Sequence, residues 1–230
     1  MIVSERGSPL LVAGVADAGR GSVIGPLILG GVSMTEEDLP KLVRLGVKDS
    51  KLLSPHRRET LAVEIKRTVT KHSVVRLSPR EIDDVVLNGR KLHRLNWLEA
   101  KAMAKVIEML RPDVAYVDAS DVLEDRFKRD ILEFLSFKVK IVSEHKADRN
   151  YPIVSAASII AKVERDREIA ELAKMHGDFG SGYPSDPRTM SFLEKCCMDE
   201  MGEYPDFVRK SWKPAKKVRD EKGSRQIKLM

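Results

Sequence analysis

The chain has few cysteines, few aromatic residues and no long apolar run, and each shortage narrows the possible classes of protein. Its only two cysteines among 230 residues, Cys196 and Cys197, are adjacent, which argues against a disulfide framework and favours two small buried side chains in a reducing compartment. Aromatic residues make up 5% of the chain, too few to indicate a broad base-stacking platform. No apolar run approaches the roughly 20 residues that span a bilayer. The N-terminal segment is charged, so we expect a cytoplasmic protein without membrane contact.

Basic residues are in excess, and much of the excess lies near the C-terminus. The formal net charge is +6 and the isoelectric point is about 9.2, a balance that favours a polyanionic partner. Segment 209–230 is rich in lysine and arginine. We expect this basic tail to add non-specific affinity for a nucleic acid duplex, with a steep dependence on salt.

The alternation of apolar runs and helix start signals predicts an α/β protein. Ser54-Pro55, Ser78-Pro79 and Asp186-Pro187 each place a capping residue before a proline, which is typical of a helix start. Strands are predicted at 10–15, 23–32, 72–78, 114–120 and 138–144, and helices at 55–69, 92–110, 124–135, within 145–177 and at 188–201. The first two strands should form a hairpin around a glycine-rich turn. This order of elements favours a mixed sheet.

Three apolar, strand-like segments lead into an aspartate, at Asp17, Asp118 and Asp148. Catalytic groups in α/β sheets gather at strand ends, and carboxylates that converge there need a cation between them. Mg²⁺ prefers oxygen ligands and leaves room for a substrate phosphate, and two such ions can promote phosphodiester hydrolysis. The alternative is that each aspartate is a turn or cap residue. His145 could carry protons or touch a phosphate, or could simply be solvated.

The tripeptide Gly19-Arg20-Gly21 follows Asp17 closely. Its glycines permit positive φ and a close approach of backbone N–H groups to an anion, and Arg20 could add a bidentate phosphate contact. The alternative is a plain hairpin turn. Next to a carboxylate that binds metal, however, an anion-binding loop is what a phosphodiester substrate requires.

Several separated motifs, in order, make the chain resemble the archaeal form of ribonuclease HII along nearly its whole length. They are "ADAGRG" (16–21), "KDSKLLSP" (48–55), "YVDAS" (116–120) with "HKADRNYPIVSAASIIAKVERD" (145–166), "GSGYPSDP" (180–187) and "RKSWKP" (209–214). The resemblance implies a ribonuclease H-like fold, a mixed five-stranded sheet flanked by helices with a helical C-terminal extension. We expect a catalytic domain over 1–176 and the extension with its basic tail over 177–230.

The resemblance also implies the activity, which is endonucleolytic hydrolysis of RNA in RNA–DNA hybrids and on the 5′ side of single ribonucleotides in duplex DNA. The products carry a 3′-hydroxyl and a 5′-phosphate, the mechanism uses two metal ions, Mg²⁺ or Mn²⁺, and the cellular role is in DNA replication and repair. Asp17, Asp118 and Asp148 match catalytic and metal-ligating positions of the family. Substrate-binding positions match Gly19, Arg20 and Gly21, which would sense the 2′-hydroxyl through the backbone, together with Lys48, Ser50 and Lys51 at phosphates and Tyr183 at the following deoxyribose.

The chain departs from the family pattern at two neighbouring positions. Where the family has Asp-Glu, this chain has Ala16-Asp17. Asp17 keeps a carboxylate but reaches less far, and Ala16 deletes a catalytic metal ligand, a loss that can cost several orders of magnitude in rate. Two readings stay open for Ala16: an engineered inactivating substitution, or a natural homologue that binds substrate and cleaves poorly. The second makes a non-catalytic binder of RNA–DNA junctions the alternative function.

The C-terminal segment also contains a partial match to a peptide that binds a protein partner. Gln226 and Leu229 match the first half of a sliding-clamp-binding peptide, but the two aromatics that such a peptide needs are absent. We therefore favour a chance match, and expect a monomer whose partner is nucleic acid.

Overall fold

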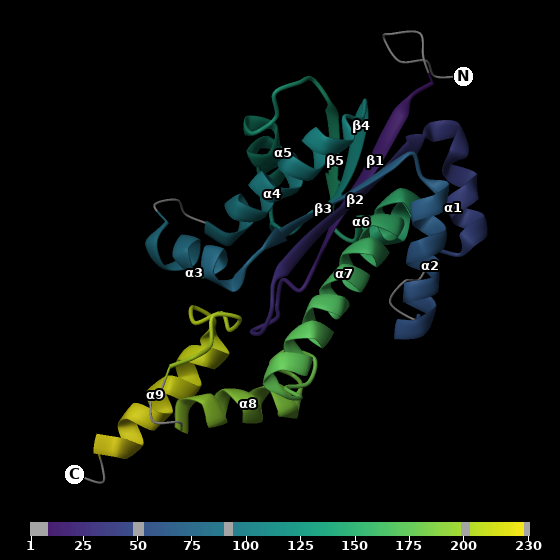
Figure 1. Cartoon of the computed structure of the whole chain (residues 1–230). Coiled ribbons are helices and arrows are strands. Elements are labelled where there is room, and N and C mark those ends of the chain that lie inside the picture. Colours follow the sequence, from purple (N-terminus) through teal and green to yellow (C-terminus); the bar gives the residue numbers. More distant parts are fainter. Residues whose placement is uncertain (1–8, 48–52, 90–93, 199–202, 228–230) are drawn as a thin grey trace. The chain divides into compact units, whose positions relative to one another are not determined.

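The computed structural model describes residues 9–47, 53–89, 94–198 and 203–227. Its elements are drawn in Figure 1. The strands are β1 (Leu11–Ala18), β2 (Leu27–Thr35), β3 (Lys71–Leu77), β4 (Val114–Asp118) and β5 (Lys140–Glu144). The helices are η1 (Glu36–Asp38), α1 (Leu39–Leu45), α2 (Pro55–Thr68), α3 (Pro79–Asn88), α4 (Arg94–Leu110), α5 (Glu124–Glu133), α6 (Ala147–Asn150), α7 (Pro152–His176), α8 (Pro187–Met198) and α9 (Lys213–Ile227).

The five strands form one mixed sheet in the order β3-β2-β1-β4-β5. Strands β1 and β2 pair antiparallel, as the predicted hairpin requires, whereas β4 runs parallel to both β1 and β5. The expected mixed five-stranded sheet is therefore confirmed. Parallel neighbours bring the carboxyl ends of β1, β4 and β5 to one edge of the sheet.

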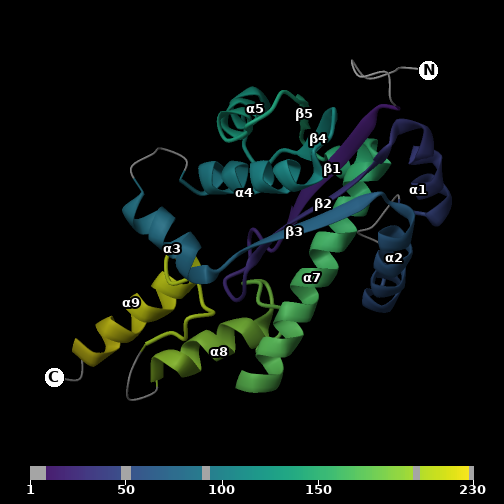
Figure 2. The ribbon, with the colours of Figure 1, turned by 45° about the horizontal axis from the view of Figure 1, so that its top comes forward.

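Two long helices pack on opposite faces of this sheet, as Figures 1 and 2 also show. A Cβ added to Gly30 of β2 would lie 2.8 Å from the Ala157 carbonyl oxygen of α7, whereas one added to Gly31 would lie 2.3 Å from Val106 of α4. Successive residues of a strand face opposite sides, so the first part of α7 covers one face and α4 the other.

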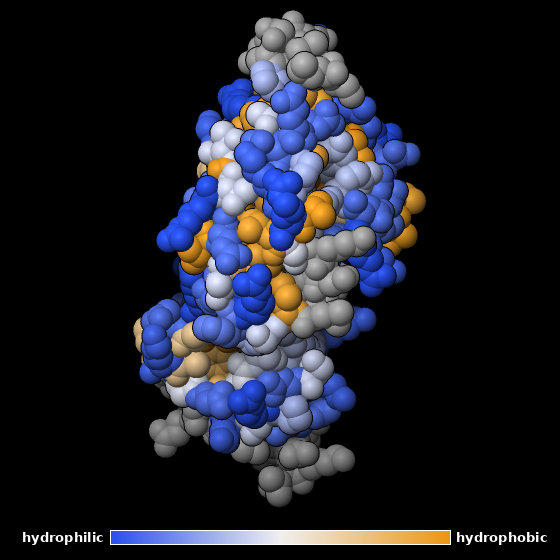
Figure 3. Space-filling view, turned by 90° about the vertical axis from the view of Figure 1, so that its right-hand side faces the viewer, coloured by the Kyte–Doolittle hydropathy of each residue, from blue (hydrophilic) through white to orange (hydrophobic). Residues whose placement is uncertain are grey.

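The face under α7 holds a continuous apolar cluster. Buried side chains of β1 and β2 meet those of α1, α2 and α7 there. Burial of such side chains stabilises the fold by about 25 cal/mol for each Å² removed from water. On the outer surface shown in Figure 3, hydrophilic residues predominate and hydrophobic ones form small patches between them. None of the helices in the described ranges combines the length and the apolar character needed to cross a membrane.

The predicted helix starts before proline are all observed. Helices α2, α3 and α8 begin at Pro55, Pro79 and Pro187. Ser54 Oγ accepts the Arg57 N–H at 3.2 Å, and Ser78 forms a complete capping box with Glu81. Each cap satisfies backbone donors that the first helical turn leaves without partners.

The predicted start of the second strand is wrong. Val23 and Ile24 are fully buried but lie before β2, in an apolar cluster with Ile169, Phe179 and other residues of the C-terminal half. Gly25 has a φ of 87°, a conformation that favours glycine and interrupts an extended strand. The apolar run 23–32 thus contributes Val23 and Ile24 to one apolar cluster and its later residues to β2.

The chain groups into two compact units. The first comprises 1–18, 28–76 and 95–164 and contains the sheet; the second comprises 19–27, 77–94 and 165–230. Helices α8 and α9 form the expected helical C-terminal segment, and the second apolar cluster belongs to their unit. The functional division at residue 176 stays a prediction.

Candidate active site

Ala16 and Asp118 lie side by side at the carboxyl end of neighbouring strands. Val15 pairs with Val117 in the parallel register of β1 and β4, and one residue further along, Ala16 comes beside Asp118. Paired residues of adjacent strands share a face, and Gly14 of β1, two residues before Ala16, faces Ile153 of α7. Ala16 and Asp118 therefore point to the α7 face.

Helix α6 brings Asp148 close to the same point. Asp118 Oδ1 accepts the backbone N–H of Ala147 at 3.1 Å, and Asp148 is the next residue of that short helix. Asp148 is buried, with 7% of its surface exposed. Two of the three predicted carboxylates thus gather where Ala16 stands.

Ala16 itself contributes no polar atom to this face. It is 1% exposed and belongs to the apolar cluster that includes Ala147 and Ile153. Its neighbour on the other side, across β2, is Gly30, which has no side chain. An aspartate at position 16 would add an oxygen ligand beside Asp118 on this face.

Asp17 occupies the opposite face of β1, because adjacent strand residues alternate. Its Oδ1 accepts the Ser120 hydroxyl at 3.3 Å, which ties it to the loop after β4. A longer side chain at this position would reach further around the strand end. Aspartate, where the family pattern has glutamate, therefore keeps its carboxylate closer to the backbone of β1.

A partly buried ion pair orders the loop after β4. Arg126 Nε donates to Asp121 Oδ2 at 2.8 Å, and its Nη2 donates to Oδ1. Burial alone would raise the pKa of Asp121, but the hydrogen bonds from Arg126 and from the Leu123 N–H outweigh it and lower the pKa to about 2. Asp121 is thus an anion at neutral pH and holds the loop that carries Ser120.

His145, the residue after β5, contacts the same loop. Its ring nitrogens lie 3.3 Å from the carbonyl oxygens of Ala119 and Val122, and its Nε2 lies 3.8 Å from Glu124 Oε1. The side chain is 47% exposed. Through these contacts His145 helps to hold the loop after β4 in place. Its role in proton transfer stays a prediction.

Glu144 lies beside Asp118 in the register of β4 and β5. It accepts the Tyr151 hydroxyl at 2.7 Å, and this hydrogen bond, with burial, raises the pKa of Tyr151 to about 12. The Tyr151 ring packs 4.5 Å from that of Tyr116. A second carboxylate near Asp118 is therefore engaged in fixing the start of α7.

In the glycine-rich loop, Gly19 but not Gly21 has the positive φ that the sequence permits. Gly19 has a φ of 88°, and a Cβ there would lie 2.8 Å from the Pro26 carbonyl oxygen, so both conformation and space demand glycine. Gly21 is exposed, and its nearest neighbour would be the Tyr183 ring at 4.0 Å. Gly19, Arg20, Gly21 and Tyr183 thus lie together within the second unit.

Two loops of that unit are joined through Ser22 and Gly182. The Gly182 carbonyl oxygen accepts the N–H groups of Val23 and Ile24 at 2.9 and 3.1 Å and the Ser22 hydroxyl at 3.0 Å. Arg165 lies beneath both, with its guanidinium 4.5 Å from the centre of the Tyr183 ring and donating to the Ser181 carbonyl oxygen. The position of Tyr183 is thereby fixed relative to the glycine-rich loop.

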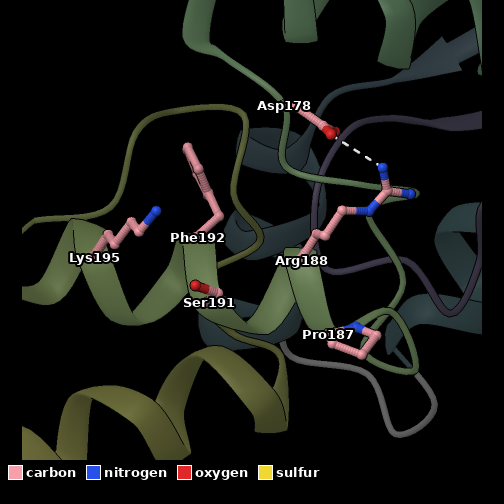
Figure 4. Close-up of a pocket in the computed structure, with 6 residues that line it drawn as sticks. All are labelled: Asp178, Pro187, Arg188, Ser191, Phe192 and Lys195. Atoms are coloured by element: carbon pink, nitrogen blue, oxygen red, sulfur yellow. Dashed lines mark hydrogen bonds and ion pairs between the residues drawn. The ribbon is translucent and has the colours of Figure 1, made fainter.

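Lys48, Ser50 and Lys51 lie outside the described residues. The pocket in Figure 4 lies on α8 and contains none of the predicted site residues. Its wall is an ion pair, Arg188 Nη1 to Asp178 Oδ2 at 3.0 Å, beside Phe192 and Lys195. This hollow is therefore separate from the predicted chemistry.

Comparison with known proteins places this arrangement in a family. The family model described as Ribonuclease HII matches residues 13–215. The chain belongs to the ribonuclease HII family. The ribonuclease HII of Pyrococcus abyssi is 46% identical over 220 residues, covering 95% of each chain.

Solved ribonuclease structures share the fold. The crystal structure of ribonuclease H2 from Pyrococcus horikoshii superimposes with a TM-score of 0.84 at 43% identity, covering 92% of this chain and 98% of that one. The ribonuclease HII of Archaeoglobus fulgidus, solved in complex with PCNA, gives a TM-score of 0.79 at 46% identity and covers 89% and 96%. The ribonuclease H-like fold is confirmed.

Ribonuclease HII enzymes are metal-dependent endoribonucleases that act on RNA–DNA substrates. The residues of this chain fit a metal only in part. Asp118 and Asp148 supply hard oxygen donors of the kind Mg²⁺ prefers, but within the described ranges no group of three or more His, Cys, Asp or Glu side chains is arranged to hold an ion. Asp118 and Asp148 would hold such an ion, and Ala16 adds no further oxygen donor to them.

Two arginines of the second unit were missed as candidate site residues. Arg165 and Arg209 are 6% and 0% exposed and contact the glycine-rich loop or its neighbours. Both lie within family motifs, which is the only sequence signal for them, because arginine is otherwise expected at the surface.

Proposed function

We propose that this protein binds RNA–DNA hybrids and DNA duplexes with embedded ribonucleotides, and hydrolyses the RNA strand on the 5′ side of the ribonucleotide at a rate reduced by Ala16. The products would carry a 3′-hydroxyl and a 5′-phosphate. The observation that supports this best is that Asp118, beside position 16, accepts the N–H of Ala147, the residue before Asp148, in a chain of this family.

The proposed roles are those that the family pattern implies for these positions. Asp17, Asp118 and Asp148 would form the catalytic carboxylate set, with Mg²⁺ or Mn²⁺ as the cofactor, and Ala16 marks the missing ligand. Gly19, Arg20 and Gly21 would read the 2′-hydroxyl, the group that distinguishes RNA from DNA at one position. Tyr183 would pack against the following deoxyribose, and Lys48, Ser50 and Lys51 would hold phosphates.

The second candidate is a binder of RNA–DNA junctions without catalysis. Ala16 favours it, because the methyl group at position 16 adds no oxygen ligand beside Asp118 and Asp148. The two candidates share substrate recognition and differ only in turnover.

A cleavage assay distinguishes them. This chain and Ala16→Asp are incubated with a DNA duplex carrying one ribonucleotide, with Mg²⁺ or Mn²⁺ as the added metal. Under the nuclease proposal, Ala16→Asp cuts at least about 100-fold faster than the present chain, at the 5′ side of the ribonucleotide only. An all-DNA duplex is the substrate control, and Ala16→Asn is the variant control. No cleavage by Ala16→Asp, with binding retained, would leave the binder as the function.

The surroundings proposed for this function are a monomer in the cytoplasm that takes part in DNA replication and repair. The complex of the Archaeoglobus fulgidus relative with PCNA supports a sliding clamp as a class of partner. In this chain Gln226 and Leu229 give only half of such a peptide. Co-elution with a purified archaeal clamp in size-exclusion chromatography would test the contact.

A further inference from the structure

Arg209 is a fully buried arginine, and its guanidinium donates hydrogen bonds to three carbonyl oxygens of one loop, residues 19–25. Its Nε donates to the Gly25 carbonyl oxygen at 3.1 Å, its Nη1 to that of Arg20 at 2.9 Å and its Nη2 to that of Gly19 at 2.8 Å. Burying a cation costs free energy unless its donors are satisfied. The planar fork suits three acceptors held in fixed directions, so the loop and the arginine constrain each other.

The backbone around Arg209 is anchored separately from its side chain. The Arg209 N–H donates to the Val23 carbonyl oxygen at 2.9 Å, the Gly25 N–H donates to that of Phe207 at 2.8 Å, and Ile24 forms a bridge with Val208. The Trp212 ring lies 5.0 Å from the guanidinium. Changing the side chain thus leaves these main-chain bonds in place, together with the bond from the Ser22 N–H to the Gly19 carbonyl oxygen at 3.2 Å. It removes the guanidinium bonds to the three carbonyls and the contact with the Trp212 ring.

The direction of the held carbonyls fixes the direction of two amides. In a trans peptide the C=O of one residue and the N–H of the next point opposite ways. Since Arg209 holds the carbonyls of Gly19 and Arg20 inward, the N–H groups of Arg20 and Gly21 point away from the guanidinium. Gly21 is exposed, beside the Tyr183 ring.

We propose that Arg209 is a positioning residue for ribose recognition, which aims the Arg20 and Gly21 amides at the 2′-hydroxyl of the substrate. This inference rests on the proposed function, since it takes the glycine-rich loop as the ribose reader. Arg209 touches no substrate. It acts by presetting two peptide planes, so that the loop does not have to be ordered when the duplex binds.

The test compares affinities for two duplexes that differ by one oxygen atom. Binding of a DNA duplex with a single ribonucleotide and of its all-DNA counterpart is measured with EDTA present, for this chain and for Arg209→Lys. Lysine keeps the charge but cannot donate to three carbonyls in the fork geometry. We expect the ratio of the two affinities to fall by about 3- to 10-fold, the effect of one hydrogen bond, while affinity for the all-DNA duplex stays constant.

Arg188→Lys is the matched control, because Arg188 is an exposed arginine of the same unit that pairs with Asp178 and Asp186. It should leave the ratio unchanged. Amide hydrogen exchange supplies a second readout: the Arg20 and Gly21 amides should exchange faster in Arg209→Lys than in this chain. If Arg209→Lys does not fold, Trp212→Leu, which removes the ring beside the guanidinium, should lower the same ratio.

The outcomes separate the two proposals. A folded Arg209→Lys, or Trp212→Leu in its place, that keeps the full ratio overturns the role of Arg209 and leaves the proposed function intact. A parent chain that binds both duplexes equally overturns ribose reading by this chain, and with it the inference. A lowered ratio in the variant, with Arg188→Lys unchanged, supports both.

Discussion

At the scale of single residues, Ala16 places a methyl group at a buried position where the family pattern has a carboxylate. Ala16 is 1% exposed and stands between Gly30 and the strand that carries Asp118. A carboxylate there would face two others across the α7 side. Carboxyl groups that lie close together disfavour each other's ionisation unless a cation lies between them.

The first prediction concerns the stability of Ala16→Asp without and with metal. In EDTA the variant should unfold at a lower temperature than this chain, because a charge is buried beside Asp118 and Asp148. We expect its free energy of unfolding to be lower by about 1–3 kcal/mol. Added Mn²⁺ should raise the unfolding temperature of the variant much more than that of this chain, since a ligand that binds only the folded state stabilises it. Thermal unfolding followed by circular dichroism measures both.

Ala16→Asn separates charge from size in this experiment. Asparagine has nearly the same volume as aspartate but adds no charge, so it should not show the large response to Mn²⁺. Equal responses of this chain, Ala16→Asn and Ala16→Asp would mean that position 16 does not complete a metal site.

Residue identity alone predicted part of this site and missed the rest. The sequence placed Asp118 at the end of a strand and Asp148 shortly after the next one, because apolar runs mark buried strands. It did not show that Ala16 and Asp17 point to opposite faces, which depends on register. It also did not single out Arg209, whose burial depends on carbonyls nearly 190 positions away in the chain.

At the scale of elements, the site depends on how closely α7 approaches the sheet. A Cβ on Gly14 would lie 2.2 Å from the Ile153 carbonyl oxygen. That atom belongs to the backbone at the start of α7, so it cannot turn aside. The helix whose N-terminal end follows Asp148 is thus seated directly on β1.

The second prediction is that Gly14→Ala strongly destabilises the protein. The added methyl group would push the start of α7 away from β1, and overpacking of this kind costs about 3 kcal/mol. Chemical denaturation gives the free energy of unfolding. The displacement of α7 should also weaken Mn²⁺ binding that depends on Asp148. Isothermal titration calorimetry with Mn²⁺, on Gly14→Ala combined with Ala16→Asp, measures this affinity.

Gly46→Ala is the control for glycine loss as such. Gly46 has a φ of 77° and no atom within 4 Å of an added Cβ, so alanine there costs only backbone strain, about 1 kcal/mol. Equal losses for Gly14→Ala and Gly46→Ala would argue against close helix–sheet contact as the cause.

Helix starts were predictable and the boundary of β2 was not, for different physical reasons. A Ser-Pro or Asp-Pro pair acts locally, through a cap and a preset φ, so the three starts could be read from adjacent residues. Val23 and Ile24 look like strand residues because they are apolar. Their partners Phe179 and Leu193 lie far along the chain, and no local pattern reports them.

At the scale of the whole molecule, the basic C-terminal segment is a structural part as well as a charge. Segment 213–227 forms α9, which buries Ala215 and Val218 in the second apolar cluster. The Tyr204 hydroxyl donates to the Ala215 carbonyl oxygen at 2.9 Å. Deleting the tail would therefore remove core contacts together with its charges, and the two effects could not be told apart.

The third prediction replaces deletion by neutralisation of exposed cations on α9. The variant Lys213→Gln/Lys217→Gln/Arg219→Gln changes three exposed side chains and spares Ala215 and Val218. If these cations contact phosphates, the slope of log affinity against log salt concentration should become shallower by about 2–3. The affinity ratio between ribonucleotide-containing and all-DNA duplexes should stay the same, because phosphate contacts do not distinguish the sugars at one position.

A second triple variant controls for net charge. Lys105→Gln/Arg129→Gln/Lys138→Gln removes the same charge from exposed positions of the first unit. Fluorescence anisotropy over a range of salt concentrations gives the slope for all three proteins. A local role for α9 requires a smaller slope in its own triple variant than in the control. Matching slopes in the two variants would show instead that the net charge of +6 acts from any part of the surface, through long-range attraction to the duplex.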